Sequence, residues 1–292
     1  MTVISSNIAE SYEASGFVHS RGLVSGPELS RLQTVTDQII DFASVYHVPD
    51  PDYRYRTDSS TGDRVFFRIN NVKVRCVEFQ ALFGHPGLLG MFRDLIGPNF
   101  IMIDDALVVK VARGGTDFPW HRDVAAYARL AGDSLVVPGI DLDVSNDENG
   151  CLHVVPGSHR DSAADLSELT SKYGFDIPGA VSIHSSTGDV CVHSGNLLHG
   201  SKPNRSATSR RTIYVAAMDI DDYLASYEPT PELVLMQMRY MARGIQLRRS
   251  LPYLEGEREY TWTGDHRWRV DLDESDYVDW GLPAAPRRAR AV

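Results

Sequence analysis

Short segments rich in Val and Ile, divided by turn residues, constrain the fold of this chain more than any other feature. Turn-forming sequences such as Arg113-Gly114-Gly115 and Glu148-Asn149-Gly150 separate these segments. Because no helical segments alternate with them, the pattern predicts an antiparallel barrel or sandwich and argues against a parallel α/β sheet. The expected strands are Val65–Val74, Ile101–Val111, Ser134–Val144, Leu152–Val155, Asp189–Val192 and Thr212–Met218.

Helical patterns flank this β-rich region. Ser25 and Glu28 have the spacing of a capping box, and apolar residues then recur at helical intervals as far as Ala43. A second helix is expected over Glu232–Arg249. The segment Val48–Gly62 is rich in Pro, Asp, Tyr and Arg, and it is expected to form a long loop that could serve as a lid.

We expect one mainly β domain with flanking helices. The chain has 292 residues, of which 42% are hydrophobic, and this suffices to bury a substantial core in a single barrel. The expected parts are N-terminal helices at about 1–45, the barrel at about 65–220, and a C-terminal helix and tail at about 231–292.

The charge balance and the cysteines exclude several classes of protein. The net charge is −10, from 39 acidic and 29 basic residues, and no sustained stripe of Lys and Arg offers a surface for nucleic acid. The cysteines Cys76, Cys151 and Cys191 lie far apart, which fits a reducing compartment better than a disulfide framework. With a polar N-terminus and no long apolar run, the chain is expected to be cytoplasmic and to bind no membrane.

A His-x-Asp pair, His121 and Asp123, carries the strongest chemical signal. In an extended strand, residues two apart project from the same face, so both side chains can reach one ion. His199 follows another strand-like segment and can supply a second imidazole. Two imidazoles and one carboxylate on one face of a metal ion form the facial triad of non-haem iron oxygenases. We therefore predict that His121, Asp123 and His199 bind a metal ion.

Arg210 and Arg211 stand at the start of the last expected strand. An arginine beside the metal would offer a planar, two-pronged donor to a dicarboxylic acid. Adjacent side chains of a strand point to opposite faces, so only one of the two can enter the barrel, and parity alone leaves the choice open. Lys110, on another expected strand, is a weaker candidate for contact with the same acid.

Further motifs lie in order along the chain. They are Pro119-Trp120-His121-Arg122-Asp123, Glu148-Asn149-Gly150-Cys151-Leu152, Pro156-Gly157-Ser158-His159-Arg160, Gly188-Asp189-Val190 and His199-Gly200-Ser201. Together they resemble the phytanoyl-CoA dioxygenase family of iron(II)/2-oxoglutarate-dependent oxygenases, and the resemblance extends from Tyr12 to about Met218. It implies a double-stranded β-helix, which is a jelly-roll, cupin-like barrel.

The resemblance also implies roles for single residues. It makes His121, Asp123 and His199 the iron ligands, and it selects Arg210, eleven residues after the distal histidine, as the partner of the distal carboxylate of 2-oxoglutarate. Ser201 is implied as a lesser contact of this cosubstrate. The implied cofactors are Fe(II), 2-oxoglutarate as cosubstrate and O2, with ascorbate as a reductant in vitro.

A dioxygenase of this kind would oxidise a C–H bond of a small metabolite or natural-product intermediate, with succinate and CO2 as coproducts. Hydroxylation is the expected outcome. Desaturation, epimerisation or ring closure within the same family is an alternative, as is a jelly-roll metal-binding protein that does not use 2-oxoglutarate. A third alternative is a catalytically silent barrel that binds a small ligand.

Other histidines and cysteines are expected to be structural. His159 lies in a Pro-Gly-Ser-His turn, where a hydrogen-bonding role is expected. His153 and His193 lie in strand-like segments and are expected at core or surface positions. Cys151 and Cys191 are expected to be small apolar residues of the core. The acidic run 141–147 is expected to be a solvated turn.

Overall fold

The computed structural model describes residues 6–46, 49–58, 62–114, 117–126, 133–161, 166–270 and 272. In this part of the chain, antiparallel strands form two sheets, one with the order β1-β9-β6-β11-β4-β3-β2 and one with the order β5-β10-β7-β8. The strands are β1 (Phe17–Ser20), β2 (Tyr53–Thr57), β3 (Arg64–Asn70), β4 (Phe100–Lys110), β5 (Phe118–His121), β6 (Val136–Asp141), β7 (Leu152–Val154), β8 (Val181–Ile183), β9 (Val190–Ser194), β10 (His199–Ser201) and β11 (Arg210–Asp219).

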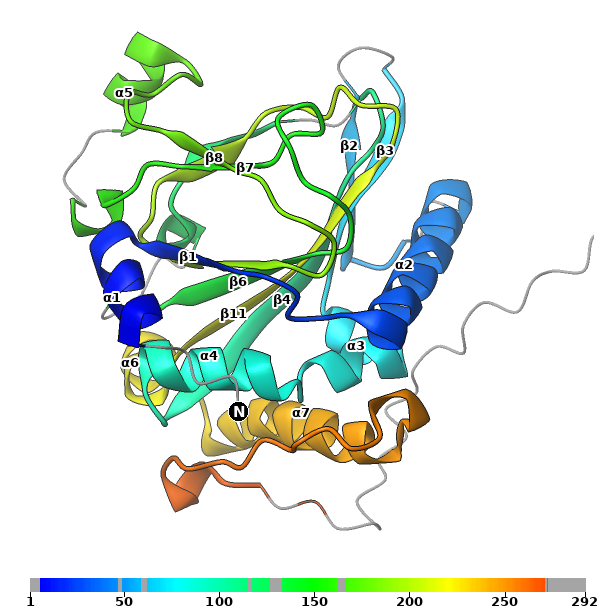
Figure 1. The fold of residues 1–292 in the computed structure, drawn as a ribbon, viewed down its shortest axis with the longest axis vertical. Coiled ribbons are helices and arrows are strands. Elements are labelled where there is room, and N and C mark those ends of the chain that lie inside the picture. The colour runs from blue at the N-terminus through cyan, green and yellow to red at the C-terminus, as the bar shows by residue number, and fades with distance from the viewer. Residues whose placement is uncertain are drawn as a thin grey trace, which may run out of the picture.

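Helices cover one face of the larger sheet. Figure 1 shows α3, α4 and α7 together on the side of β4, β6 and β11 that faces away from the smaller sheet, while α2 lies beside β3. The helices are α1 (Ser6–Ser15), α2 (Gly26–Tyr46), α3 (Val77–Leu82), α4 (Pro86–Ile96), α5 (Leu166–Tyr173), α6 (Ile220–Tyr227) and α7 (Pro231–Ser250). None of these described helices is long and apolar enough to cross a membrane.

Strand alternation divides the larger sheet into a core face and a pocket face. In β11, Ile213 and Val215 are fully buried in the hydrophobic core that the helices complete. Tyr214 and Ala216, one residue further along, line a pocket on the opposite face. Because side chains alternate along a strand, the same segment closes the core and builds the wall of the pocket.

The predicted jelly-roll, cupin-like fold with flanking helices is confirmed, since the strands are antiparallel and form two facing sheets. The predicted strands and the helix over Glu232–Arg249 correspond to observed elements, with ends that differ by a few residues. The Trp-, Tyr- and Asp-rich tail of the expected C-terminal segment is described as far as residue 270 and at 272, and the rest of it lies outside the described residues.

Two strands of the larger sheet, β1 and β2, precede residue 65, where the barrel was expected to begin. The supposed loop Val48–Gly62 contains β2, an edge strand that pairs with β3. Tyr53 and Tyr55 pack on the core whereas Arg54 lies on the solvent side, which is the period-two pattern of a strand. Much earlier in the chain, β1 pairs with β9 and forms the opposite edge of the sheet.

Glu28 does not have the capping role that its spacing suggested. Its carboxylate is buried and bonds to the guanidinium of Arg248 on α7, at 2.6 and 3.0 Å. The structure gives no side-chain hydrogen bond from Ser25 to the start of α2, whose backbone begins with the Leu29 N–H donating to the Ser25 carbonyl. A buried ion pair between two helices therefore replaces the expected local cap.

Candidate active site

The three residues predicted to bind a metal lie together at one end of the smaller sheet. His121 ends β5 and His199 begins β10, and the two are directly opposite in the antiparallel pairing. Asp123 opens a short 3-10 turn that follows β5. One donor atom from each of the three side chains lies within 4.8 Å of the other two. The reason given for the His-x-Asp pair is thus partly wrong: the strand stops at His121, and a turn brings the carboxylate into place.

The distances among the donor atoms suit a shared ion. The Nε2 atoms of His121 and His199 lie 3.6 and 3.7 Å from the same oxygen, Oδ1 of Asp123. Roughly 2.0–2.2 Å separates such ligands from a divalent metal, so ligand atoms around one ion stand about 3 Å or more apart. The Asp123 carboxylate therefore needs little movement to bind together with both imidazoles.

Backbone carbonyls orient both imidazoles. The Nδ1 atom of His121 lies 2.7 Å from the carbonyl oxygen of Pro119, and the Nδ1 atom of His199 lies 2.9 Å from that of Leu197. A carbonyl can only accept a hydrogen bond, so each Nδ1 carries the proton and each Nε2 presents a lone pair toward Asp123. This is the arrangement that a metal-binding histidine requires.

The charges at the site also favour a cation. Burial, aided by the neighbouring imidazoles, lowers the pKa of His199 to about 3, so this ring is neutral near pH 7. Burial tends to raise the pKa of Asp123, but His199 and His121 outweigh it and hold the pKa well below its usual range. Burial tends to lower the pKa of His121, but Asp123 and the Pro119 carbonyl outweigh it and raise this pKa. An ionised carboxylate beside the neutral imidazole of His199 attracts a divalent transition metal, which would displace any proton on His121.

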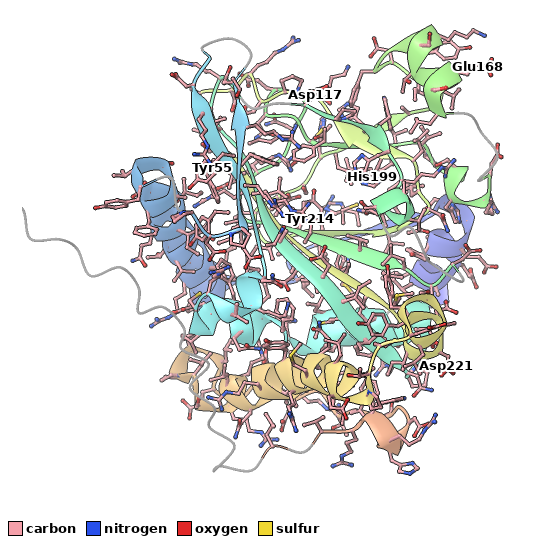
Figure 2. All side chains as sticks on the ribbon, turned by 180° about the vertical axis from the view of Figure 1, so that it is seen from behind. Tyr55, Asp117, Glu168, His199, Tyr214 and Asp221 are labelled. Carbon is pink, nitrogen blue, oxygen red and sulfur yellow. The ribbon has the colours of Figure 1, made fainter. Side chains whose placement is uncertain are left out.

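A cavity of about 110 Å³ extends from these side chains between the two sheets. A single water needs roughly 10–15 Å³ measured in this way, so the space admits a small organic molecule. Figure 2 shows His199 and Tyr214 in this interior, whereas Glu168 and Asp221 lie on the outside. The rest of the lining comes from Arg68, Asp104, Asp105, Ala106, Val108, Phe118, Val137, Leu152, His193, Gly200, Ser201, Arg210 and Ala216.

Arg210 lines the same cavity as the three candidate ligands. It is buried, and its guanidinium donates a hydrogen bond to the Thr212 hydroxyl at 3.0 Å and lies 3.5 Å from Asp141. Its Nε atom is buried and has no hydrogen-bond partner among the described residues. A buried donor without a partner is costly, so the site is suited to an additional acceptor such as a carboxylate.

Arg211 points to the opposite face of β11. Its guanidinium pairs with Asp143 at 2.7 Å and with Asp37 of α2, away from the cavity. These contacts correct the interpretation of the acidic run 141–147 as a solvated turn: Asp141 is buried beside Arg210, and Asp143 is paired with Arg211.

Two further residues lie near Arg210. Ser201, at the end of β10, is buried and lines the cavity. Lys110 stands opposite Arg210 in the pairing of β4 with β11, and its ammonium donates to the Ser201 carbonyl at 3.4 Å. Burial, with the positive charge of Arg210 added to it, lowers the pKa of Lys110 to about 7. Arg210 lines the cavity, and Lys110 beside it adds a positive charge when protonated, so this end of the cavity attracts an anion.

His193 belongs to the site although its sequence context favoured a structural position. Its ring is fully buried in β9, 4.4 Å from the ring of His199, and its Nδ1 lies 3.8 Å from Oδ2 of Asp123. Every residue of β9 is buried, so alternation along the sequence gives no sign of which face meets the cavity. His153, by contrast, is outside the cavity lining, and His159 bonds to the Glu13 carbonyl, the structural role expected for it.

A jelly-roll barrel with two imidazoles and a carboxylate at one end of its cavity defines the class of mononuclear non-haem iron oxygenases. The sequence profile described as Phytanoyl-CoA dioxygenase (PhyH) matches residues 12–212, so the chain belongs to the phytanoyl-CoA dioxygenase family. The predicted family and enzyme class are therefore confirmed, and the protein is a dioxygenase of the iron and 2-oxoglutarate type.

Individual relatives are distant. A 2-aminoethylphosphonate dioxygenase from uncultured bacterium HF130_AEPn_1 is 22% identical over 212 residues, which are 70% of this chain and 78% of that protein. The crystal structure of AviO1 from Streptomyces viridochromogenes Tue57 is 25% identical with a TM-score of 0.65, and the match covers 75% of this chain and 97% of the other. EctD from S. alaskensis with bound Fe is 20% identical with a TM-score of 0.64, covering 75% and 78%, which shows the shared fold.

Proposed function

We propose that this protein binds Fe(II) through His121, Asp123 and His199 and uses 2-oxoglutarate and O2 to oxidise a C–H bond of a small molecule. The observation that carries the proposal is the convergence of the three donor atoms within 4.8 Å at the cavity, with both Nε2 lone pairs directed at the carboxylate. The donor set fits iron, because it supplies three ligands on one face and leaves the cavity side open.

The bound iron supplies the redox chemistry that couples conversion of 2-oxoglutarate to succinate and CO2 with oxidation of the substrate. The protein positions the reactants. The carbonyls of Pro119 and Leu197 hold the two imidazole rings, so the ligand geometry is fixed before the cosubstrate arrives.

Arg210 is proposed to bind the distal carboxylate of 2-oxoglutarate. Its place in the cavity lining and its unpartnered Nε support this role, and the charge of Lys110 beside it strengthens the attraction for a dianion. The Ser201 hydroxyl, which lines the same end, is proposed as a lesser contact. Asp141 and Thr212 hold the guanidinium, so little ordering remains when the cosubstrate binds.

The substrate is proposed to be a small polar metabolite or natural-product intermediate, and hydroxylation the outcome. Arg68 and Asp104, 3.8 Å apart and partly exposed, place both signs of charge in the lining of the cavity. Relatives named as dioxygenases of 2-aminoethylphosphonate and of ectoine support a small polar substrate. Desaturation, epimerisation or ring closure are the alternative outcomes, because the structure and position of the bound substrate determine which product forms after a C–H bond is oxidised.

We also propose that residues 1–292 act as one domain. The main hydrophobic core supports this, because it includes Val18 of β1, Leu32 of α2, Val215 of β11 and Met238 of α7 in one cluster.

Succinate formation tests the proposed reaction. The purified protein with Fe(II), ascorbate and 2-oxoglutarate in air should form succinate, and a substrate should accelerate it. Omission of Fe(II), or the substitution His199→Ala, should abolish succinate formation because one of three protein ligands is lost. The exposed His266 provides the control, and His266→Ala should keep the rate. Equal succinate formation by wild type and His199→Ala at saturating iron would refute the proposed site.

A further inference from the structure

A second cluster of metal-binding side chains lies outside the active-site cavity lining. Asp147 and Cys151 belong to the connection between β6 and β7, His153 lies within β7, and His184 directly follows β8. The four residues combine two imidazoles, a thiol and a carboxylate. This is a different donor set from that of the active site, because it includes sulfur.

The donor atoms converge on the Asp147 carboxylate. Its Oδ2 lies 2.9 Å from Nε2 of His184, and its Oδ1 lies 3.6 Å from Sγ of Cys151. The donor atoms of these three residues all lie within 4.8 Å of one another. Nε2 of His153 lies 3.5 Å from the same Oδ1, although His153 is not part of the group whose donor atoms all lie within 4.8 Å of one another. Ligand atoms around a tetrahedral zinc ion stand roughly 3.3–3.8 Å apart, given metal–ligand distances of about 2.0–2.3 Å. The distances from Asp147 to Cys151 and to His153 fall in this range, whereas the hydrogen bond from His184 to Asp147 would lengthen when an ion binds.

One imidazole of the cluster is oriented as a ligand. The Nδ1 of His153 lies 3.1 Å from the Cys151 carbonyl, which can only accept, so Nε2 presents its lone pair to the cluster. Cys151 and His153 are buried, whereas Asp147 and His184 are about 60% and 57% exposed. Two ligands are thus fixed in the protein, and two at the surface leave an entry path for an ion.

Glu28, His85 and Glu257 form another group of potential metal ligands, but this group already contains a positive charge. The guanidinium of Arg248 bonds to both of its glutamates and already supplies the positive charge. Among the described residues, the basic side chains paired with Asp147 are the imidazoles of His153 and His184. An added cation is therefore accommodated at the cluster around Cys151 and not at the one around Arg248.

We propose that Asp147, Cys151, His153 and His184 form a second metal site, for a divalent ion of the zinc type. A borderline-soft ion suits mixed nitrogen, sulfur and oxygen ligands, and such sites bind Zn²⁺ more strongly than Fe²⁺. The bond from Sγ to the metal forms as the thiol proton leaves to solvent, so binding releases one proton and involves no change of oxidation state. Burial raises the pKa of the free Cys151 thiol to about 12, so the proton is present until the metal displaces it.

An ion at this site would join two segments behind the cosubstrate end of the cavity. Ser145 and Ser185, next to the proposed ligands, already pair through their backbones. Ser145 and Asp141 both lie against the guanidinium of Arg210. The metal would therefore stabilise the segments whose residues contact the guanidinium of Arg210.

Cobalt binding tests the proposal independently of the active site. Asp123→Ala/His199→Ala removes the first site, and the metal-free variant is titrated with Co²⁺. We expect one Co²⁺ per chain, with a sulfur-to-cobalt charge-transfer band and the intense visible bands of tetrahedral cobalt. Adding Cys151→Ser should abolish the charge-transfer band, and Asp147→Asn should weaken Co²⁺ binding by at least about 10-fold, since even outer partners of a metal site contribute that much.

Cys76→Ser is the matched control, because Cys76 is a free thiol outside the cluster. It should leave the cobalt spectrum unchanged, and circular dichroism should show that all variants are folded. The proposal is overturned if the double variant shows no sulfur-to-cobalt band. It is equally overturned if the band survives Cys151→Ser or disappears with Cys76→Ser.

Discussion

Two adjacent arginines at the start of β11 have opposite surroundings. Arg210 faces the cavity, and Arg211 pairs with Asp143 and Asp37 on the other face. A hydrogen bond to a charged group contributes about 1.5–3 kcal/mol, so Arg210→Ala should weaken 2-oxoglutarate binding by roughly 10- to 150-fold. Arg211→Ala should leave the affinity within a few-fold of wild type. Anaerobic calorimetric titration of the iron-loaded protein measures both dissociation constants.

Unfolding must be followed in parallel, because Arg210→Ala leaves the buried Asp141 with its hydroxyl partners but without its cationic partner. Arg210→Lys keeps a positive charge but loses the two-pronged donor, so its affinity should fall between those of wild type and Arg210→Ala. A large loss for Arg211→Ala with a small one for Arg210→Ala would contradict the proposed role of Arg210.

Because of Lys110, we expect the affinity of the protein for 2-oxoglutarate to depend on pH. Its pKa is lowered to about 7 by burial and by Arg210, and a bound dianion would raise it again. The protonated protein should therefore bind 2-oxoglutarate more tightly, and the affinity should fall as the pH rises through about 7 and above. Lys110→Met should weaken binding at low pH and flatten this profile.

Lys202 provides the control for Lys110, because it is partly exposed and pairs with Asp176. Lys202→Met should keep the pH profile of wild type. Dissociation constants measured between about pH 6 and pH 9 decide the question. A profile for Lys110→Met as steep as that of wild type would show that another group causes the dependence.

At the scale of elements, a buried ion pair connects α2 to α7. Arg248 bonds to Glu28 at 2.6 and 3.0 Å and to Glu257 at 2.7 Å, and both Arg248 and Glu28 are more than 90% buried. Removal of one partner from a buried pair costs about 3–5 kcal/mol, because the other charge stays buried. Arg248→Met should therefore lower the free energy of unfolding by about this amount.

The neighbouring Arg249 offers a matched comparison. Its ion pair with Glu259 is exposed, so Arg249→Met should change the free energy of unfolding by less than about 1 kcal/mol. The double variant Glu28→Gln/Arg248→Met should recover part of the loss, since the buried charge of Glu28 is then removed as well. Urea unfolding measures the stability of Arg248→Met, Arg249→Met and the double variant. Equal stability of Arg248→Met and Arg249→Met would contradict a buried ion pair between Glu28 and Arg248.

The sequence specified some elements and residues better than others, for physical reasons. The strands β4 and β11 are long and rich in β-branched residues, so their composition predicts them. In β2, the alternation of Tyr53, Arg54 and Tyr55 was present but was outweighed by neighbouring Pro and Asp, which suggested a loop. Capping-box spacing at Glu28 was misleading because a partner more than two hundred positions away, Arg248, determines the position of its carboxylate.

The candidate site also contains some residues that the sequence predicts and others that it does not. His121 and Asp123 are close in sequence, so their spacing predicted their proximity, although a turn and not a continuous strand provides it. His193 approaches Asp123 only through the pairing of distant strands. Since β9 is covered on both faces, its sequence contains no polar alternation that would indicate the cavity side.

At the scale of the whole molecule, the two sheets bring the candidate iron ligands and Arg210 to one cavity. The ligands come from β5, β10 and the turn after β5, which belong to the smaller sheet and its connection, whereas Arg210 comes from the larger sheet. The proposed reaction therefore depends on the correct packing of the sheets, because neither sheet alone carries both the candidate iron ligands and Arg210.

The most direct measurement is an anaerobic titration of the metal-free protein with Fe(II) and then 2-oxoglutarate, followed by visible absorption. We predict a metal-to-ligand charge-transfer band that requires both additions and saturates at one iron per chain. His199→Ala should lose the band, while His266→Ala should keep it. Absence of the band from the folded wild-type protein, or its persistence at full intensity in His199→Ala, would contradict an iron and 2-oxoglutarate site built on His121, Asp123 and His199.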